Sequence, residues 1–168
     1  GTTPSMIRRL MGDLHAVCRR YGIVLCGGHT EVTDAVKRPV VSGMLCGTVE
    51  PGRLVDKKNM RTGDRLLMTK RIAVEGTAII ARDFAGRLQQ KGVSAETIQA
   101  GADLLSRISI LPEARIAADF PGVSAMHDVT EGGIATAVED CSAAGGHRLQ
   151  VRLDRLRFLP ETAALGRA

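Results

Sequence analysis

Short apolar runs alternate with helix-type apolar patterns along this chain, and this alternation is what most constrains its fold. The runs are short enough for buried or half-buried strands; they cover residues 23–26, 40–49, 65–70, 123–126 and 149–153. Between them, apolar residues recur at helical spacing; these stretches are 4–21, 75–88, 95–108, 112–120 and 134–145. Strands and helices mixed in this way, without a repeat, predict an α/β or α+β fold with sheet and helix layers.

The ends of several expected helices carry specific signals. Thr3 can cap a first helix with Pro4 at its first position, and Gly22 can end it. Ser94 is a second candidate cap, and the pair Gly145-Gly146 closes the last long pattern. In the first helix we expect one inward face, formed by Ile7, Leu10, Met11, Leu14, Val17 and Cys18.

Composition places the chain among globular proteins. Of its 168 residues 44% are hydrophobic and 24% charged, and no apolar run is long enough to span a membrane. Its four cysteines show no CxxC spacing, which predicts buried, reduced thiols in a cytoplasmic protein. Because the sequence lacks an initiator methionine and a secretory signal, we expect a cytoplasmic fragment.

The net charge of +5 comes partly from a basic run between Arg53 and Arg71. This run has no interleaved aromatic residues on which bases could stack. We therefore expect a solvated basic face and no nucleic-acid partner, although modest positive charge also suits small anionic ligands.

The stretch HDVTEGG, residues 127–133, comes where an expected strand gives way to an expected helix. Helix N-termini carry free N–H groups and a partial positive charge, and glycine lets a phosphate approach the backbone closely. Asp128 and Glu131 could hold Mg²⁺ while the amides of Gly132 and Gly133 contact a phosphate. Alternatively, Asp128 caps the helix, Glu131 completes a capping box, and the glycines permit close packing. The residues alone leave both readings open.

A second glycine cluster, residues 27–31, also follows an apolar run. His29 and Glu31 could bind a metal or transfer a proton, and Thr30 could contact a phosphate. A sharp turn with a solvent-facing histidine is the alternative. There is no Walker-type loop and no G-x-S-x-G elbow, so neither P-loop nor serine-hydrolase chemistry is expected.

Three blocks taken in order resemble the AIR synthase-related superfamily. They are GIVLCGGHTEVTDAVKRPVVSGMLCGTV, MRTGDRLLMTKRIAVEGTAIIA and VSAMHDVTEGGIATAVEDCSAAGGHRLQV. The family includes aminoimidazole ribonucleotide synthetase, the hydrogenase-maturation protein HypE, selenophosphate synthetase and thiamine-monophosphate kinase. The D-x-T-x-G-G pattern from Asp128 to Gly133 is most similar to the HypE-like branch.

The resemblance implies two α/β domains: residues 1–49 would end an ATP-binding amino-terminal domain, and residues 50–168 would form most of an AIR synthase-like carboxy-terminal domain with helices on a mixed sheet. It implies ATP and Mg²⁺ as cofactors, a small-molecule or carbamoyl-thiol substrate, and a homodimer. Gly27, Gly28 and Thr30 would lie by the nucleotide, with Thr130, Gly132 and Gly133 on the opposing wall.

Within this resemblance, Asp128, His29 and Glu31 are the expected catalytic residues, and Asp128 and Glu131 the expected metal ligands. Three departures affect that expectation: His29 replaces an acidic residue of many relatives, and both the family's glycine- and aspartate-bearing nucleotide loop and the terminal cysteine of HypE are absent. A non-catalytic, dimerising member of the same fold is therefore the alternative function.

Overall fold

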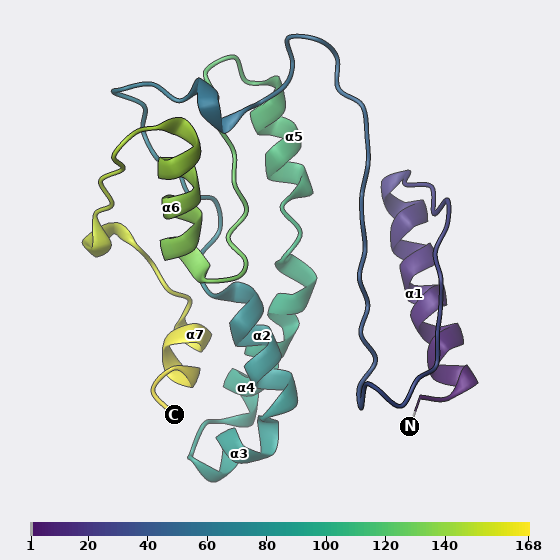
Figure 1. Ribbon diagram of the computed structural model, residues 1–168. Coiled ribbons are helices and arrows are strands. Elements are labelled where there is room, and N and C mark those ends of the chain that lie inside the picture. Colours follow the sequence, from purple (N-terminus) through teal and green to yellow (C-terminus); the bar gives the residue numbers. More distant parts are fainter. Residues whose placement is uncertain (1) are drawn as a thin grey trace. The chain divides into compact units, whose positions relative to one another are not determined.

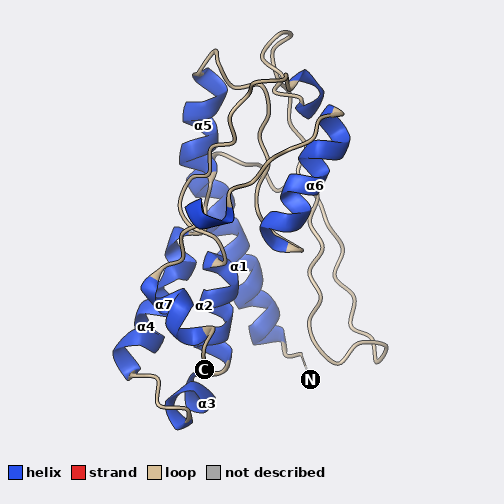
Figure 2. Cartoon of the chain, turned by 90° about the vertical axis from the view of Figure 1, so that its left-hand side faces the viewer, coloured by secondary structure: helices blue, strands red, loops and turns tan. Residues whose placement is uncertain are grey.

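The structure, a computed structural model, describes residues 2–168. The chain divides into two compact units, one ending at Thr48 and the other running from Val49 to Ala168. Figures 1 and 2 show helices joined by long connecting segments.

The first unit is built around the helix α1 (Pro4–Tyr21). As predicted, the Thr3 side chain caps it by accepting a hydrogen bond from the Met6 amide, and Pro4 occupies the first turn. Gly22 ends it in the left-handed conformation (φ 68°), which glycine adopts without steric cost. The predicted inward face is mostly wrong: of its residues only Cys18 is buried, and Val17 is 51% exposed.

The second unit contains every other helix of the described chain. The α-helices are α2 (Val74–Asp83), α3 (Ala85–Gln90), α4 (Ala95–Asp103), α5 (Leu111–Asp119), α6 (Gly133–Gly145) and α7 (Pro160–Leu165). Three short 3₁₀ helices join them: η1 (Lys57–Asn59), η2 (Leu104–Arg107) and η3 (Leu153–Arg155). As predicted, the Ser94 side chain caps α4, and Gly146 ends α6 in the left-handed conformation.

The core of the second unit lies where α2, α3, α4 and α7 meet (Figure 1). Its buried members are Ala81, Leu88, Ile98 and Leu165, one from each of these helices. Gly101 lets α4 approach α2 closely, because a β-carbon there would lie 3.1 Å from the Ala81 β-carbon. Small residues thus bring these short helices into contact.

The carboxyl end of α6 packs against η1 and against Met60, the residue that follows η1. A β-carbon on Gly145 would lie 3.1 Å from the Lys57 carbonyl oxygen, so the two backbones are close. His147 Nε2 lies 2.9 Å from the Met60 carbonyl oxygen, and the Ser142 hydroxyl donates to the His147 carbonyl oxygen (2.6 Å). These contacts fix α6, whose opposite end carries the candidate site.

The predicted α/β (α+β) fold with a mixed sheet is wrong for this structure: residues 2–168 form no strand (Figure 2). A strand exists only through ladder hydrogen bonds to a second strand. The predicted runs form no such ladder, and many of their apolar side chains stay exposed, as Met44 (90%) and Leu67 (88%) illustrate. An apolar run indicates what a segment can bury but does not supply the partner that a sheet requires.

The expectation for the cysteines has a mixed outcome. All four cysteines are free, but only Cys18 and Cys141 are buried; Cys26 and Cys46 lie in exposed extended chain. Within residues 2–168, no helix has the length and apolar character needed to cross a membrane.

Candidate functional site

The segment from His127 to Gly133 leads directly into α6. Residues 123–130 are extended, Glu131 and Gly132 form a turn, and α6 begins at Gly133 (Figure 1). The site is therefore an extended chain that reverses at the N-terminus of a helix of 13 residues.

Glycine is present at positions 132 and 133 for different structural reasons. Both are left-handed, with φ of 71° at Gly132 and 63° at Gly133. A β-carbon on Gly132 would lie 1.9 Å from the Thr136 hydroxyl oxygen, so no side chain fits there. A β-carbon on Gly133 would meet nothing within 4 Å. Gly132 is thus required by packing, whereas Gly133 leaves space open beside the backbone.

No side chain caps α6. Gly132 is its N-cap and the helix has no side-chain cap hydrogen bond, so the alternative in which Asp128 and Glu131 form a capping box is wrong. The Gly133 amide donates to the Thr130 carbonyl oxygen (3.0 Å) and closes the turn. The next amides, those of Ile134 and Ala135, belong to the first turn, where N–H groups have no acceptor within the helix. These amides, more than that of Gly133, are the donors open to an anion.

A histidine joins the extended chain to α6. His127 Nδ1 lies 2.5 Å from the Asp128 carbonyl oxygen and 3.5 Å from Asp128 Oδ1, while Nε2 lies 3.2 Å from Asp140 Oδ2 on α6. Both carboxylate side chains are about half exposed (55% and 53%). This His127–Asp140 contact joins the extended chain to the side of α6. Sequence reasoning missed it, because it depends on the chain passing over the second turn of α6.

Glu131 is held as an anion by the turn itself. Its own backbone amide and the Thr130 hydroxyl donate hydrogen bonds to its carboxylate and keep the pKa of Glu131 below its ordinary value. Thr130, Glu131, Gly132 and Gly133 thus form one short turn, and Asp128 lies in the extended chain before it. Over residues 2–168, no group of three or more His, Cys, Asp or Glu side chains has a geometry that could hold a metal ion.

The other predicted site residues, Gly27, Gly28, His29, Thr30 and Glu31, lie in the first unit. They are exposed extended chain. Within the described part of the chain, the side chains of His29 and Glu31 make no hydrogen bond or ion pair with each other or with other residues. The two predicted clusters therefore belong to different units, and their joining into one site remains a prediction.

Comparison with known proteins identifies both units. Residues 1–49 match the family model of the AIR synthase related protein, N-terminal domain, and residues 61–165 match that of the C-terminal domain. A carbamoyl dehydratase HypE of Cupriavidus necator is 24% identical over 162 residues, 94% of this chain and 43% of that protein. A selenide, water dikinase of Geobacter metallireducens is 31% identical over 151 residues, 89% of this chain and 40% of that protein. The chain spans less than half the length of these relatives, and no solved structure matches it.

Proposed function

Because the chain belongs to the AIR synthase related family, we propose that it is part of an ATP-dependent enzyme that transfers a phosphoryl group to an amide or carbamoyl oxygen. Of the relatives, one is named a carbamoyl dehydratase and another a dikinase, and a kinase transfers phosphoryl groups. If the protein instead has the activity of a selenophosphate synthetase or a thiamine-monophosphate kinase, selenide or thiamine phosphate would accept the phosphoryl group.

The observation that carries this proposal is the uncapped start of α6. Its first-turn amides have no side-chain acceptor, and the open space at Gly133 lets an anion approach them. A helix N-terminus of this kind favours a phosphate through its N–H groups and its dipole. The role proposed for this turn is to bind and orient the nucleotide's phosphates.

The carboxylates of Asp128 and Glu131 are suitable ligands for a Mg²⁺ ion that is also bound by phosphate. Asp128 is half exposed and Glu131 is anionic, so both offer oxygen atoms to a cation. Two carboxylates are enough for a Mg²⁺ ion whose other ligands are phosphate and water oxygens. A site formed by protein side chains alone would need three or more such ligands, and the described residues offer no such group. In our proposal Asp128 and Glu131 hold Mg²⁺, which when bound neutralises phosphate charge.

The remaining roles follow from the same proposal. Thr130 shares the turn with the first-turn amides, and Gly27, Gly28 and Thr30 of the first unit would contact the nucleotide from the other side. His29 and Glu31 would assist as an acid–base or metal-binding pair. A homodimer formed by the complete protein is part of this proposal.

Calorimetric titration of the chain with ATP and Mg²⁺ tests the proposal. Asp128→Asn should weaken nucleotide binding about tenfold or more, because it replaces an anionic ligand of the cation with a neutral one. The matched control is Asp83→Asn at the end of α2, which makes the same charge change and should leave binding unaltered.

If Asp128→Asn binds ATP as tightly as the unaltered chain, the role of Asp128 fails. If the unaltered chain shows no metal-dependent ATP binding, the proposal itself fails. That result favours the alternative, a non-catalytic member of the same family.

A further inference from the structure

A cationic cavity lies at the start of α2. It measures about 220 Å³. We name it the Lys70 pocket after its lining residues: Lys70, Arg71, Val74, Leu104, Arg107 and Leu159. Pockets that enclose drug-sized ligands have volumes of about 300–1,000 Å³, so this one suits a smaller molecule. It shares no residue with the turn at 127–133.

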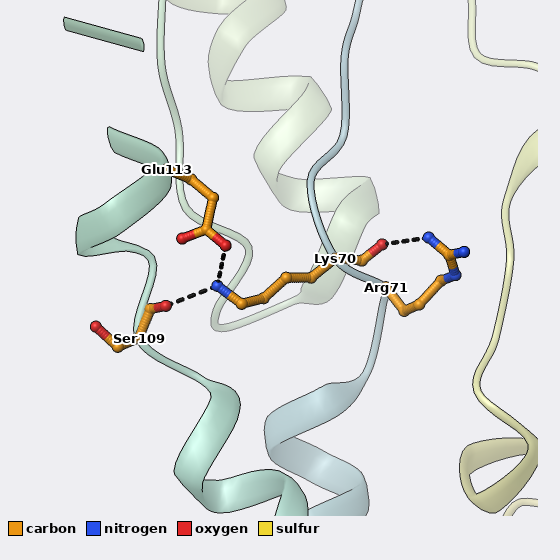
Figure 3. A network of polar contacts seen from close by, with 4 residues as sticks. All are labelled: Lys70, Arg71, Ser109 and Glu113. Carbon is orange, nitrogen blue, oxygen red and sulfur yellow. Dashed lines mark hydrogen bonds and ion pairs between the residues drawn. The ribbon is translucent and has the colours of Figure 1, made fainter. Parts of the chain in front are cut away.

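The residues that line this pocket carry three positive charges, two of which have no carboxylate partner among the described residues. Lys70 Nζ donates to the Ser109 carbonyl oxygen (2.7 Å) and forms an ion pair with Glu113 (Figure 3). That hydrogen bond from Lys70 lowers the pKa of Glu113, which is therefore ionised and neutralises one cation. Arg71 and Arg107 remain without a carboxylate partner among the described residues.

The guanidinium group of Arg71 is already oriented. Its Nη1 donates to the Lys70 carbonyl oxygen (2.8 Å), as Figure 3 shows, and this bond uses only one of its five N–H donors. The other donors are free for an oxyanion such as phosphate, which guanidinium groups bind in a bidentate manner. Ordering the side chain beforehand lowers the entropy lost on binding.

The backbone beneath the pocket is strained in the way that ligand sites often are. Lys70 (φ 56°) and Ala73 (φ 60°) are the only described residues other than glycine in the left-handed region. Both belong to the turn that begins α2, and Ala73 caps that helix without a side-chain hydrogen bond. The first turn of α2 begins at Val74, which lines the pocket, and its amides have no side-chain acceptor.

We propose that the Lys70 pocket binds a small phosphate-type oxyanion that carries a short apolar group. Arg71, Arg107 and the first-turn amides of α2 would bind the oxyanion, and Val74, Leu104 and Leu159 would contact the apolar group. This second anion site goes beyond the nucleotide role proposed for the α6 turn. It differs from that turn because it relies on fixed cations rather than on carboxylates that hold Mg²⁺.

Titration of the ¹⁵N-labelled chain with inorganic phosphate, at constant ionic strength, tests this proposal. We expect saturable shifts of the Val74 amide and of the Arg71 and Arg107 side-chain signals. Arg107→Gln should weaken binding about tenfold, the usual scale for one charge-assisted hydrogen bond. Arg82→Gln, on α2 but outside the pocket, is the matched control and should have no effect.

Two further comparisons distinguish a built pocket from general positive charge. Phenyl phosphate should bind more tightly than inorganic phosphate, because Val74, Leu104 and Leu159 would contact its ring. Glu113→Gln should also tighten phosphate binding, because it removes the one negative charge beside Lys70. Equal weakening by Arg82→Gln, or shifts that never saturate, would overturn the proposal.

The test is independent of the nucleotide experiment. Arg107→Gln should leave ATP binding with Mg²⁺ unchanged, and Asp128→Asn should leave phosphate binding at the Lys70 pocket unchanged. If Arg107→Gln weakens both ligands equally, there is one anion site and the second is refuted.

Discussion

Alanine at Gly132 and alanine at Gly133 should have different consequences, although the two glycines are adjacent and share a left-handed backbone. An L-residue with a β-carbon pays about 1–2 kcal/mol to adopt that conformation. At Gly132 the new methyl group would also lie 1.9 Å from Thr136 Oγ1 and 2.7 Å from Thr136 Cβ. Overpacking of this kind costs about 1–3 kcal/mol, so Gly132→Ala should destabilise the second unit by about 2–5 kcal/mol.

At Gly133 only the conformational cost applies, because a β-carbon there meets nothing within 4 Å. Gly133→Ala should therefore cost about 1–2 kcal/mol of stability. Its methyl group would occupy the space through which an anion reaches the first-turn amides of α6. We expect this variant to lose nucleotide affinity while its fold is largely kept.

Urea unfolding followed by far-ultraviolet circular dichroism measures the two free energies of unfolding. Thr136→Ala should recover part of the loss in the Gly132→Ala background but none in the Gly133→Ala background, since only Gly132 faces that side chain. If the two glycine variants lose the same stability and Thr136→Ala rescues neither, then the steric distinction between the glycines is refuted.

Other parts of the chain give further expected outcomes. Ile98→Ala should lower the unfolding free energy by about 2–5 kcal/mol, measured by urea unfolding, because Ile98 is 6% exposed in the core of the second unit. Thr3→Ala should cost about 1 kcal/mol of α1 stability through loss of its cap; a matching loss of helical signal checks this, and an unchanged signal would contradict it. Since Lys70 lowers the pKa of Glu113 in the folded state, its contribution to stability is present above the ordinary pKa of 4.5 and is lost as pH falls below it. Lys70→Met should remove that part of the pH dependence, and an unchanged profile would refute the pairing.

Sequence signals that act within a few residues predicted structure well. The cap at Thr3, the stop at Gly22 and the cap at Ser94 depend on neighbouring backbone groups, and the structure confirms each of them. Burial was predicted less well because it depends on distant residues. Val17, expected on the inward face of the first helix, is 51% exposed, whereas Cys18 beside it is 8% exposed.

Features that require a distant partner could not be predicted from local pattern. A sheet requires a second strand, and the described chain contains none, so the runs at 23–26 and 40–49 remain extended. The contact between His127 and Asp140 likewise depends on how the chain passes over α6. The Lys70 pocket combines residues from three separate segments, and only the excess of basic residues between Arg53 and Arg71 pointed toward it.

The central claim is that the uncapped first turn of α6 binds the phosphates of a nucleotide. The most direct measurement follows the backbone amide signals of Ile134 and Ala135 in the ¹⁵N-labelled chain as ATP and Mg²⁺ are added. We expect saturable shifts at these amides, and Gly133→Ala or Asp128→Asn should reduce them. Amides of the α6 first turn that do not shift while the nucleotide binds elsewhere on the chain would contradict it.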